Sequence, residues 1–133
     1  MAERSYRLAL PYTLSRSRGR RYPMLPVTFT YLRTTQPFNG LVDSGAERSA
    51  CSEAAAREAE IDLDQFPVRR IRGIVGQTRA RLCPIDMNIL GRRISLEILV
   101  VEADIVLLGC HDIFRAFQFG FDERASTLLV EPY

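Results

Sequence analysis

The chain has 133 residues, of which 47% are hydrophobic and 26% are charged, and its formal net charge is +2. This length predicts one compact domain, and the hydrophobic content excludes an intrinsically disordered chain. All 18 basic residues are arginine, which excludes lysine-based catalysis and a Walker-type phosphate loop. The single histidine argues against a Ser-His-Asp triad and multi-histidine metal sites. We therefore expect chemistry based on carboxylates, cysteine, hydroxyls or backbone, without a metal or cofactor.

The three cysteines, Cys51, Cys83 and Cys110, are widely spaced, and no pair has CxxC spacing. This pattern predicts reduced thiols rather than a zinc site or a disulfide framework. Residues 1–14 lack the apolar core of a signal peptide, and no stretch approaches the ~20 apolar residues that span a membrane. We therefore expect a soluble cytoplasmic protein without a membrane span.

Charge is distributed unevenly along the chain. Residues 1–40 carry seven arginines and one acid, whereas residues 41–133 carry eleven arginines and fifteen acids. Four of the arginines fall within the segment Ser15-Arg16-Ser17-Arg18-Gly19-Arg20-Arg21. Such a run could contact nucleic-acid phosphates or an acidic membrane surface, but no aromatic side chains interleave with it to stack on bases. We expect a solvated basic arm over residues 1–21, without specific nucleic-acid binding, and one domain over residues 22–133.

From residue 23 onwards the sequence predicts short strands. Residues 27–31 alternate apolar and polar side chains, as in a half-buried strand, and residues 34–37 are typical of a turn. Residues 38–42 form an apolar segment that leads directly into Asp43-Ser44-Gly45-Ala46. Residues 52–61 predict a helix, because an acid lies near its positive end and its alanines favour helical backbone.

The middle of the chain predicts two β-hairpins. Residues 68–82 predict a hairpin whose tip is bracketed by Gly73 and Gly76. Residues 85–101 predict a second hairpin that turns at residues 91–93. A tip bracketed by glycines is typical of a hairpin with a mobile end.

The last third of the chain continues this pattern. The apolar run 105–108 predicts a buried strand ended by Gly109, and residues 112–117 predict a short second helix. Residues 127–130 predict a last strand. Six or seven short strands with one or two short helices indicate an all-β protein built as a closed barrel.

Asp43-Ser44-Gly45 is the strongest candidate for a chemical site. A buried apolar strand delivers the carboxylate to a tight turn, where the Ser44 hydroxyl can bond to backbone or to another carboxylate. Gly45 has no side chain and allows close backbone approach. Asp, Ser and Gly are ordinary turn residues, so the motif alone is a weak indication of a catalytic site. Its apolar flank, the predicted helix after it and the later glycine-containing segments strengthen this interpretation.

Three segments resemble the retropepsin-type aspartic proteases, in particular their single-domain retroviral and bacterial members. These segments are Leu41-Val42-Asp43-Ser44-Gly45-Ala46, the hairpin tip Gly73-Ile74-Val75-Gly76, and Leu107-Leu108-Gly109. The resemblance covers about residues 22–133, including the tail Phe119-Gly120-Phe121-Asp122 and the strand after it. It implies an all-β fold, namely a closed retropepsin-like acid-protease barrel lobe with one or two short helices and a flap hairpin.

The resemblance also implies a mechanism. Each chain of such an enzyme supplies one catalytic carboxylate, and two chains pair so that the two carboxylates share a proton in one cleft. The implied function is a homodimeric aspartic endopeptidase that hydrolyses a protein or peptide substrate without a cofactor. The implied site consists of catalytic Asp43, its supporting residues Ser44, Gly45 and Ala46, the flap residues Gly73, Ile74, Val75 and Gly76, and the second apolar–glycine motif Leu107, Leu108 and Gly109.

The segment after this second motif leaves an alternative open. Many family members have an arginine there, whereas this chain has Cys110-His111-Asp112. The alternative is a catalytically inactive retropepsin-like module that dimerises or binds peptides. Cys110 and His111 could also form a nucleophilic pair, but neighbours in sequence usually point apart.

Three arginines of the first hairpin also have two interpretations. Arg69, Arg70 and Arg72 are expected on the exposed face of a flap strand. If they line the cleft instead, they would favour acidic side chains in the substrate.

Overall fold

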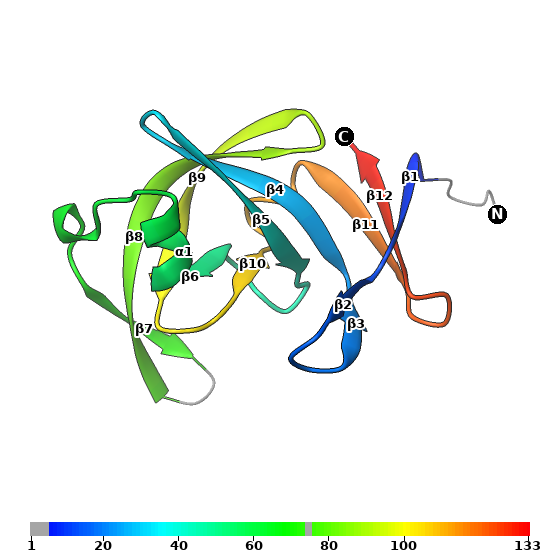
Figure 1. The fold of residues 1–133 in the computed structure, drawn as a ribbon, viewed down its shortest axis with the longest axis horizontal. Coiled ribbons are helices and arrows are strands. Elements are labelled where there is room, and N and C mark those ends of the chain that lie inside the picture. The colour runs from blue at the N-terminus through cyan, green and yellow to red at the C-terminus, as the bar shows by residue number, and fades with distance from the viewer. Residues whose placement is uncertain (1–5, 74–75) are drawn as a thin grey trace.

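The computed structural model describes residues 6–73 and 76–133 (Figure 1). Its described part is mostly β-sheet, which confirms the all-β prediction, with one α-helix and one turn of 3₁₀-helix. The strands are β1 (Leu8–Pro11), β2 (Thr13–Ser15), β3 (Arg20–Tyr22), β4 (Met24–Tyr31), β5 (Thr34–Val42), β6 (Ala50–Ser52), β7 (Arg69–Gly73), β8 (Gly76–Ile89), β9 (Arg92–Val101), β10 (Val106–Leu108), β11 (Phe117–Asp122) and β12 (Thr127–Pro132). The helices are α1 (Glu53–Glu58) and the 3₁₀ turn η1 (Leu63–Gln65).

The main sheet has the strand order β4-β5-β10-β6-β9-β8-β7, and β4 also pairs with β8. This extra pairing joins the first strand to the sixth, so the sheet curls round into a ring, and only β7 extends beyond it. The pairs β5–β10 and β6–β9 are parallel, and the other pairs are antiparallel. A ring of strands with side chains alternating inward and outward encloses a core and leaves few free strand edges.

The core fills the inside of this ring. Its largest fully buried side chains include Phe29 of β4, Met87 of β8 and Leu108 of β10. Leu108 packs directly over Gly40 of β5, where a Cβ atom would lie 2.8 Å from the Leu108 side chain. The close approach of β5 and β10 therefore depends on a residue without a side chain.

The second predicted hairpin is confirmed as β8 and β9. The turn between them consists of Leu90 and Gly91, whose φ angles are 51° and 81°. Two successive positive φ angles are the signature of a type I′ turn, which suits the right-handed twist of paired strands. Asp86 on β8 accepts hydrogen bonds from Arg93 and Ser95 of β9, and these bonds hold the pKa of its carboxyl below the usual range.

Helix α1 confirms the predicted helix in a shorter form. Its N-cap is Ser52, whose Oγ accepts a hydrogen bond from the Ala55 N–H at 3.0 Å. This bond satisfies one of the free N–H groups at the start of a helix. Ala55 and Ala56 are buried, so the alanine-rich face lies against the barrel.

The predicted second helix is wrong. Residues 110–116 form turns, and strand β11 begins at Phe117. The Asp112 carboxylate does not cap a helix but accepts a hydrogen bond from the Ser49 N–H at 3.4 Å. A segment this short between two strands disfavours a stable helix, because helix nucleation has a high entropic cost.

The expected N-terminal arm has a different structure over its described residues. Strand β1 pairs with β12, and β11 completes a three-stranded sheet beside the barrel (Figure 1). Tyr12 is buried, with 3% of its surface exposed. Residues 13–22 form the β2–β3 hairpin, which carries the four arginines of the basic run. Folded structure therefore begins before residue 22, since β1 pairs with the last strand, β12.

A hydrogen bond fixes the start of the chain to the β11–β12 turn. The Tyr12 hydroxyl donates to Oε1 of Glu123 at 2.8 Å. Burial, with the nearby Glu123 carboxylate, raises the pKa of Tyr12 to about 12. The hydroxyl therefore stays protonated and keeps donating to the carboxylate throughout the neutral range.

Among the described residues, no helix has the length and apolar character required to cross a bilayer.

Candidate active site

Asp43 lies at the point where β5 leaves the main sheet. Its backbone N–H donates to the Leu108 carbonyl at 3.1 Å, so the end of β5 stays attached to β10 up to this residue. The half-buried Asp43 side chain turns back on its own loop, where Oδ1 accepts a hydrogen bond from the Gly45 N–H at 2.8 Å. This is an Asx turn, and it leaves the other carboxylate oxygen, Oδ2, with no intrachain partner among the described residues.

The two apolar–glycine motifs lie side by side. Strand β10 runs parallel to β5, with Leu107 opposite Leu41 and Leu108 opposite Val42. Partners in this register point to the same side of the sheet, so Leu41 and Leu107 lie on one face. Side chains alternate along a strand, which places Asp43 on that same face. The structure thus brings these two separated segments of the predicted site together.

The loops that follow the two motifs are held to each other through backbone groups. The Cys110 N–H donates to the Ala46 carbonyl, and the His111 N–H donates to the Glu47 carbonyl, each at 2.8 Å. The Cys110 thiol donates to the Ser44 carbonyl at 3.3 Å. The thiol is therefore engaged with the Asp43 loop, an arrangement that does not favour a Cys110–His111 nucleophilic pair.

Gly109 sits at the closest contact between these loops. A Cβ atom at this position would lie 2.4 Å from the Arg48 carbonyl carbon and 2.8 Å from the Ser49 nitrogen. The Gly109 N–H donates to Oγ of Ser49 at 3.0 Å, and Ser49 is fully buried. Sequence reasoning missed Ser49, because its only signal is a contact with a residue 60 positions away.

The exposed part of the Asp43 loop consists of Ser44 and Gly45, while Ala46 is half-buried. A Cβ atom at Gly45 would lie 3.2 Å from Oδ1 of Asp43. A larger residue would therefore crowd the carboxylate. The loop presents a carboxylate, a hydroxyl-bearing residue and an open backbone stretch in three consecutive positions.

The first predicted hairpin is present as β7 and the start of β8. Gly73 is paired with Gly76, whereas Ile74 and Val75 of the predicted tip lie outside the described residues. Arg81, at the base of the hairpin, donates to the Leu63 carbonyl and, at 2.9 Å, to the Phe66 carbonyl. These bonds attach the base of the hairpin to the segment that follows α1.

The arginines of this hairpin are exposed, as expected. They are Arg69, Arg70, Arg72 and Arg79. Arg70 is paired with Arg79, so these two cations lie on the same side of the ribbon. Four cations are therefore carried on the strands next to the predicted tip.

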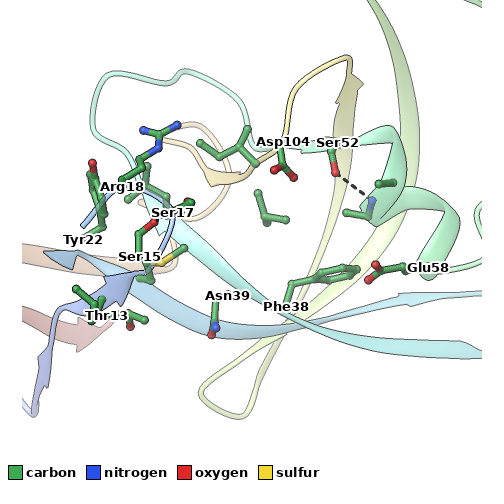
Figure 2. A pocket seen from close by; sticks show the side chains of 17 residues that line it. Thr13, Ser15, Ser17, Arg18, Tyr22, Phe38, Asn39, Ser52, Glu58 and Asp104 are labelled. Atoms are coloured by element: carbon green, nitrogen blue, oxygen red, sulfur yellow. Dashed lines mark hydrogen bonds between the residues drawn. The ribbon is translucent and has the colours of Figure 1, made fainter. Parts of the chain in front are cut away.

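A pocket of about 420 Å³ lies between the β2–β3 hairpin, β5, the start of α1 and the loop before β10 (Figure 2). Leu41 and Ile105 contribute apolar surface to its lining. Arg18 and Tyr22 lie at the hairpin end, whereas Glu58 and Asp104 lie toward the helix and the loop, as Figure 2 shows. Leu41 lies two residues before Asp43, whereas Asp43 and the loop after it are not part of the pocket lining.

The fold is that of the retropepsin-like proteases. Among solved structures, the chain matches the EIAV protease complexed with the inhibitor HBY-793, a retroviral protease, with a TM-score of 0.53 and 23% sequence identity. The match covers 67% of this chain and 82% of that chain. Comparison by sequence finds no matching protein family and no matching curated protein.

Proposed function

We propose that the protein is an aspartic endopeptidase whose active site forms between two copies of the chain, with Asp43 as the catalytic residue of each. The observation that carries this proposal is the position of Asp43 in a retropepsin-like fold, at the end of β5 and bonded through its N–H to β10. The flanking loops are bonded to each other through Gly109, Cys110 and His111. This framework holds the carboxylate in a fixed position, as catalysis requires.

Two copies are needed because the chemistry requires two carboxylates in different protonation states. When two carboxyl groups lie within hydrogen-bond distance, they cannot both ionise and they share one proton. Each chain contributes one Asp-Ser-Gly loop of this kind. A two-fold axis beside the loop would bring Asp43 of the partner subunit into contact with it.

The reaction would proceed by general acid–base catalysis. Ionised Asp43 takes a proton from a water molecule, and the water oxygen forms a bond to the scissile carbonyl carbon. The protonated carboxyl of the partner's Asp43 donates to the carbonyl oxygen and stabilises its developing charge. The tetrahedral intermediate collapses when Asp43 returns that proton to the amide nitrogen and the C–N bond breaks, which releases an amine and a carboxylic acid.

The remaining residues of the predicted site would support this reaction. The Ser44 hydroxyl would brace the pair of carboxylates, while Gly45 and Ala46 line the floor of the substrate channel. The hairpin of β7 and β8 would act as a flap over an extended peptide and exclude water. Such a peptide would add a strand to the flap and to the floor through backbone hydrogen bonds.

The alternative function is a retropepsin-like module that dimerises or binds peptides without cleaving them. The observation that favours it is the segment Cys110-His111-Asp112. Oδ1 of Asp112 is buried and has no hydrogen-bond partner within the described residues. In this alternative the cleft would hold a peptide, but the two carboxylates would not be positioned for hydrolysis.

Cleavage of a mixed peptide library from pH 3 to 8 tests the proposal. We expect cleavage at defined bonds, inhibition by a statine-type inhibitor, and a dimer in sedimentation velocity experiments. A folded dimer that cleaves no peptide at any pH would instead support the binding module. A chain that remains monomeric at high concentration would contradict an active site formed between two copies.

A further inference from the structure

The β2–β3 hairpin forms one wall of the pocket beside the candidate site. Thr13, Ser15 and Ser17 from the hairpin all line this pocket (Figure 2). In the β2–β3 register Thr13 lies opposite Tyr22, and Ser15 lies opposite Arg20. Opposed residues of an antiparallel pair point to the same side. Leu14, which lies opposite Arg21, lines the pocket too, so both sides of the hairpin border it, and Arg18 is the arginine in its lining.

The pocket lies along β5, the strand that leads to Asp43. Asn39 and Leu41 line the pocket, and they occupy alternate positions of β5, two residues apart, in the direction of Asp43. Met24, which pairs with Leu41, lines it as well. An extended peptide advances about 3.3 Å per residue. A peptide whose carbonyl lies at Asp43 would therefore place a side chain at this pocket within a few residues of that carbonyl.

The hairpin is strongly positive. Arg16, Arg18, Arg20 and Arg21 are all exposed, and the segment that contains them has no acid. The salt bridges found among the described residues involve the arginines at positions 7, 57 and 93, so none of the four has a carboxylate partner in this part of the chain. The Arg18 guanidinium lies over the Tyr22 ring, 5.8 Å from its centroid, which holds it at the hairpin end of the pocket.

The opposite end of the pocket carries the exposed carboxylates of Glu58 and Asp104. The pocket therefore carries Arg18 at the hairpin and two acids toward the helix and the loop. An acidic side chain near the hairpin would gain a charge-assisted hydrogen bond from the Arg18 guanidinium, which has no carboxylate partner among the described residues. A basic side chain in the same place would be repelled.

We propose that the β2–β3 hairpin selects the substrate, with Arg18 favouring polypeptides that carry an acidic residue a few positions from the bond presented to Asp43. This inference rests on the proposed peptidase function and names the class of substrate for that site. A polypeptide fits the hairpin better than a nucleic acid, because its one aromatic ring, Tyr22, is covered by Arg18 and is not free to stack on a base.

Pairs of peptides that differ by one carboxylate test this proposal. A sequence that the protein cleaves is synthesised with Asp or Asn at each of the four positions on either side of the scissile bond. At one or more positions on one side, we expect kcat/KM to be about fivefold higher for Asp than for Asn, as befits an exposed ion pair. The ratio should fall toward one in Arg18→Glu, and also at high salt. Arg92→Glu, at the exposed β8–β9 turn, is the matched control for charge and should keep the wild-type ratio.

A binding measurement separates failure of this proposal from failure of the proposed function. Asp43→Asn is mixed with two fluorescent octapeptides of alanine and serine that differ only in an Asp or Asn at the fourth position, and fluorescence anisotropy measures the two dissociation constants. Preference for the Asp peptide that Arg18→Glu removes supports the proposal, even if no peptide is cleaved. Equal affinities, or a preference that Arg18→Glu leaves intact, would overturn it. Tighter binding of a single-stranded oligouridine of matched charge, lost in Arg18→Glu, would also overturn it and assign the hairpin to nucleic acid.

Discussion

Asp43→Asn is expected to reduce peptide hydrolysis by at least ~10³-fold, because an amide cannot take a proton from the attacking water. The substitution keeps the size of the side chain, and the Asn Oδ1 can still accept the hydrogen bond from the Gly45 N–H. The variant should therefore fold and dimerise as the wild type does. Its initial rate on the most rapidly cleaved peptide, with its far-UV circular dichroism spectrum, measures the effect.

Asp62→Asn is the matched control. Asp62 is an exposed acid that precedes η1, and its side chain makes no capping hydrogen bond there. Its substitution should leave the rate unchanged. Hydrolysis by Asp43→Asn within about tenfold of the wild-type rate would remove Asp43 from the mechanism.

Gly109→Ala is expected to lower the free energy of unfolding by about 3 kcal/mol, because its Cβ atom would overlap the backbone of the Asp43 loop. The nearest atoms are the carbonyl carbon of Arg48 and the nitrogen of Ser49, neither of which can move as a side chain can. The displacement should also break the bond from the Gly109 N–H to Ser49. Urea unfolding followed by circular dichroism measures the loss.

Gly91→Ala provides the comparison for this second prediction. Gly91 has a φ of 81°, and a Cβ atom there would meet nothing within 4 Å. Its substitution should cost only the backbone strain of an alanine at positive φ, about 1 kcal/mol. If Gly109→Ala costs no more than Gly91→Ala, the close contact between the two loops does not stabilise the fold.

Several elements of the barrel could be predicted from short-range patterns in the sequence. The alternation at residues 27–31 matches β4, the apolar segment before Asp43 matches the end of β5, and Ser52 begins the helix. The placement of Leu107 beside Leu41 is a contact between residues far apart in the chain. Periodicity alone contains no information about such a contact, and the family resemblance was the only guide to it.

The N-terminal segment could not be predicted in this way. Leu8 and Leu10 alternate with exposed residues, as in a strand, but four residues are too short to indicate one. Their partner is β12, more than a hundred positions later, and only the three-dimensional fold reveals the pairing. The arginine run that follows is expected from its sequence to be a solvated arm. It forms a hairpin instead, and because every arginine of this hairpin is exposed, its sequence has the same polar character as an arm.

The local sequence was misleading after Gly109. Asp112 is a common helix N-cap residue, and apolar residues follow it. In the fold its carboxylate accepts a hydrogen bond from Ser49, and Phe117 is fully buried as the first residue of a strand. Tertiary contacts with a distant loop therefore outweigh the helical preference of this short segment.

Two copies of Asp43 act together in the proposed mechanism, and experiments that mix active and inactive chains test this requirement. Wild-type and Asp43→Asn chains are unfolded, combined in different proportions at constant total concentration, and refolded together. If a dyad across the dimer is required, activity follows the square of the wild-type fraction, and an equal mixture retains about a quarter of the activity. Activity that falls in direct proportion to the wild-type fraction, leaving about half in the equal mixture, would show that one carboxylate suffices and would contradict the account.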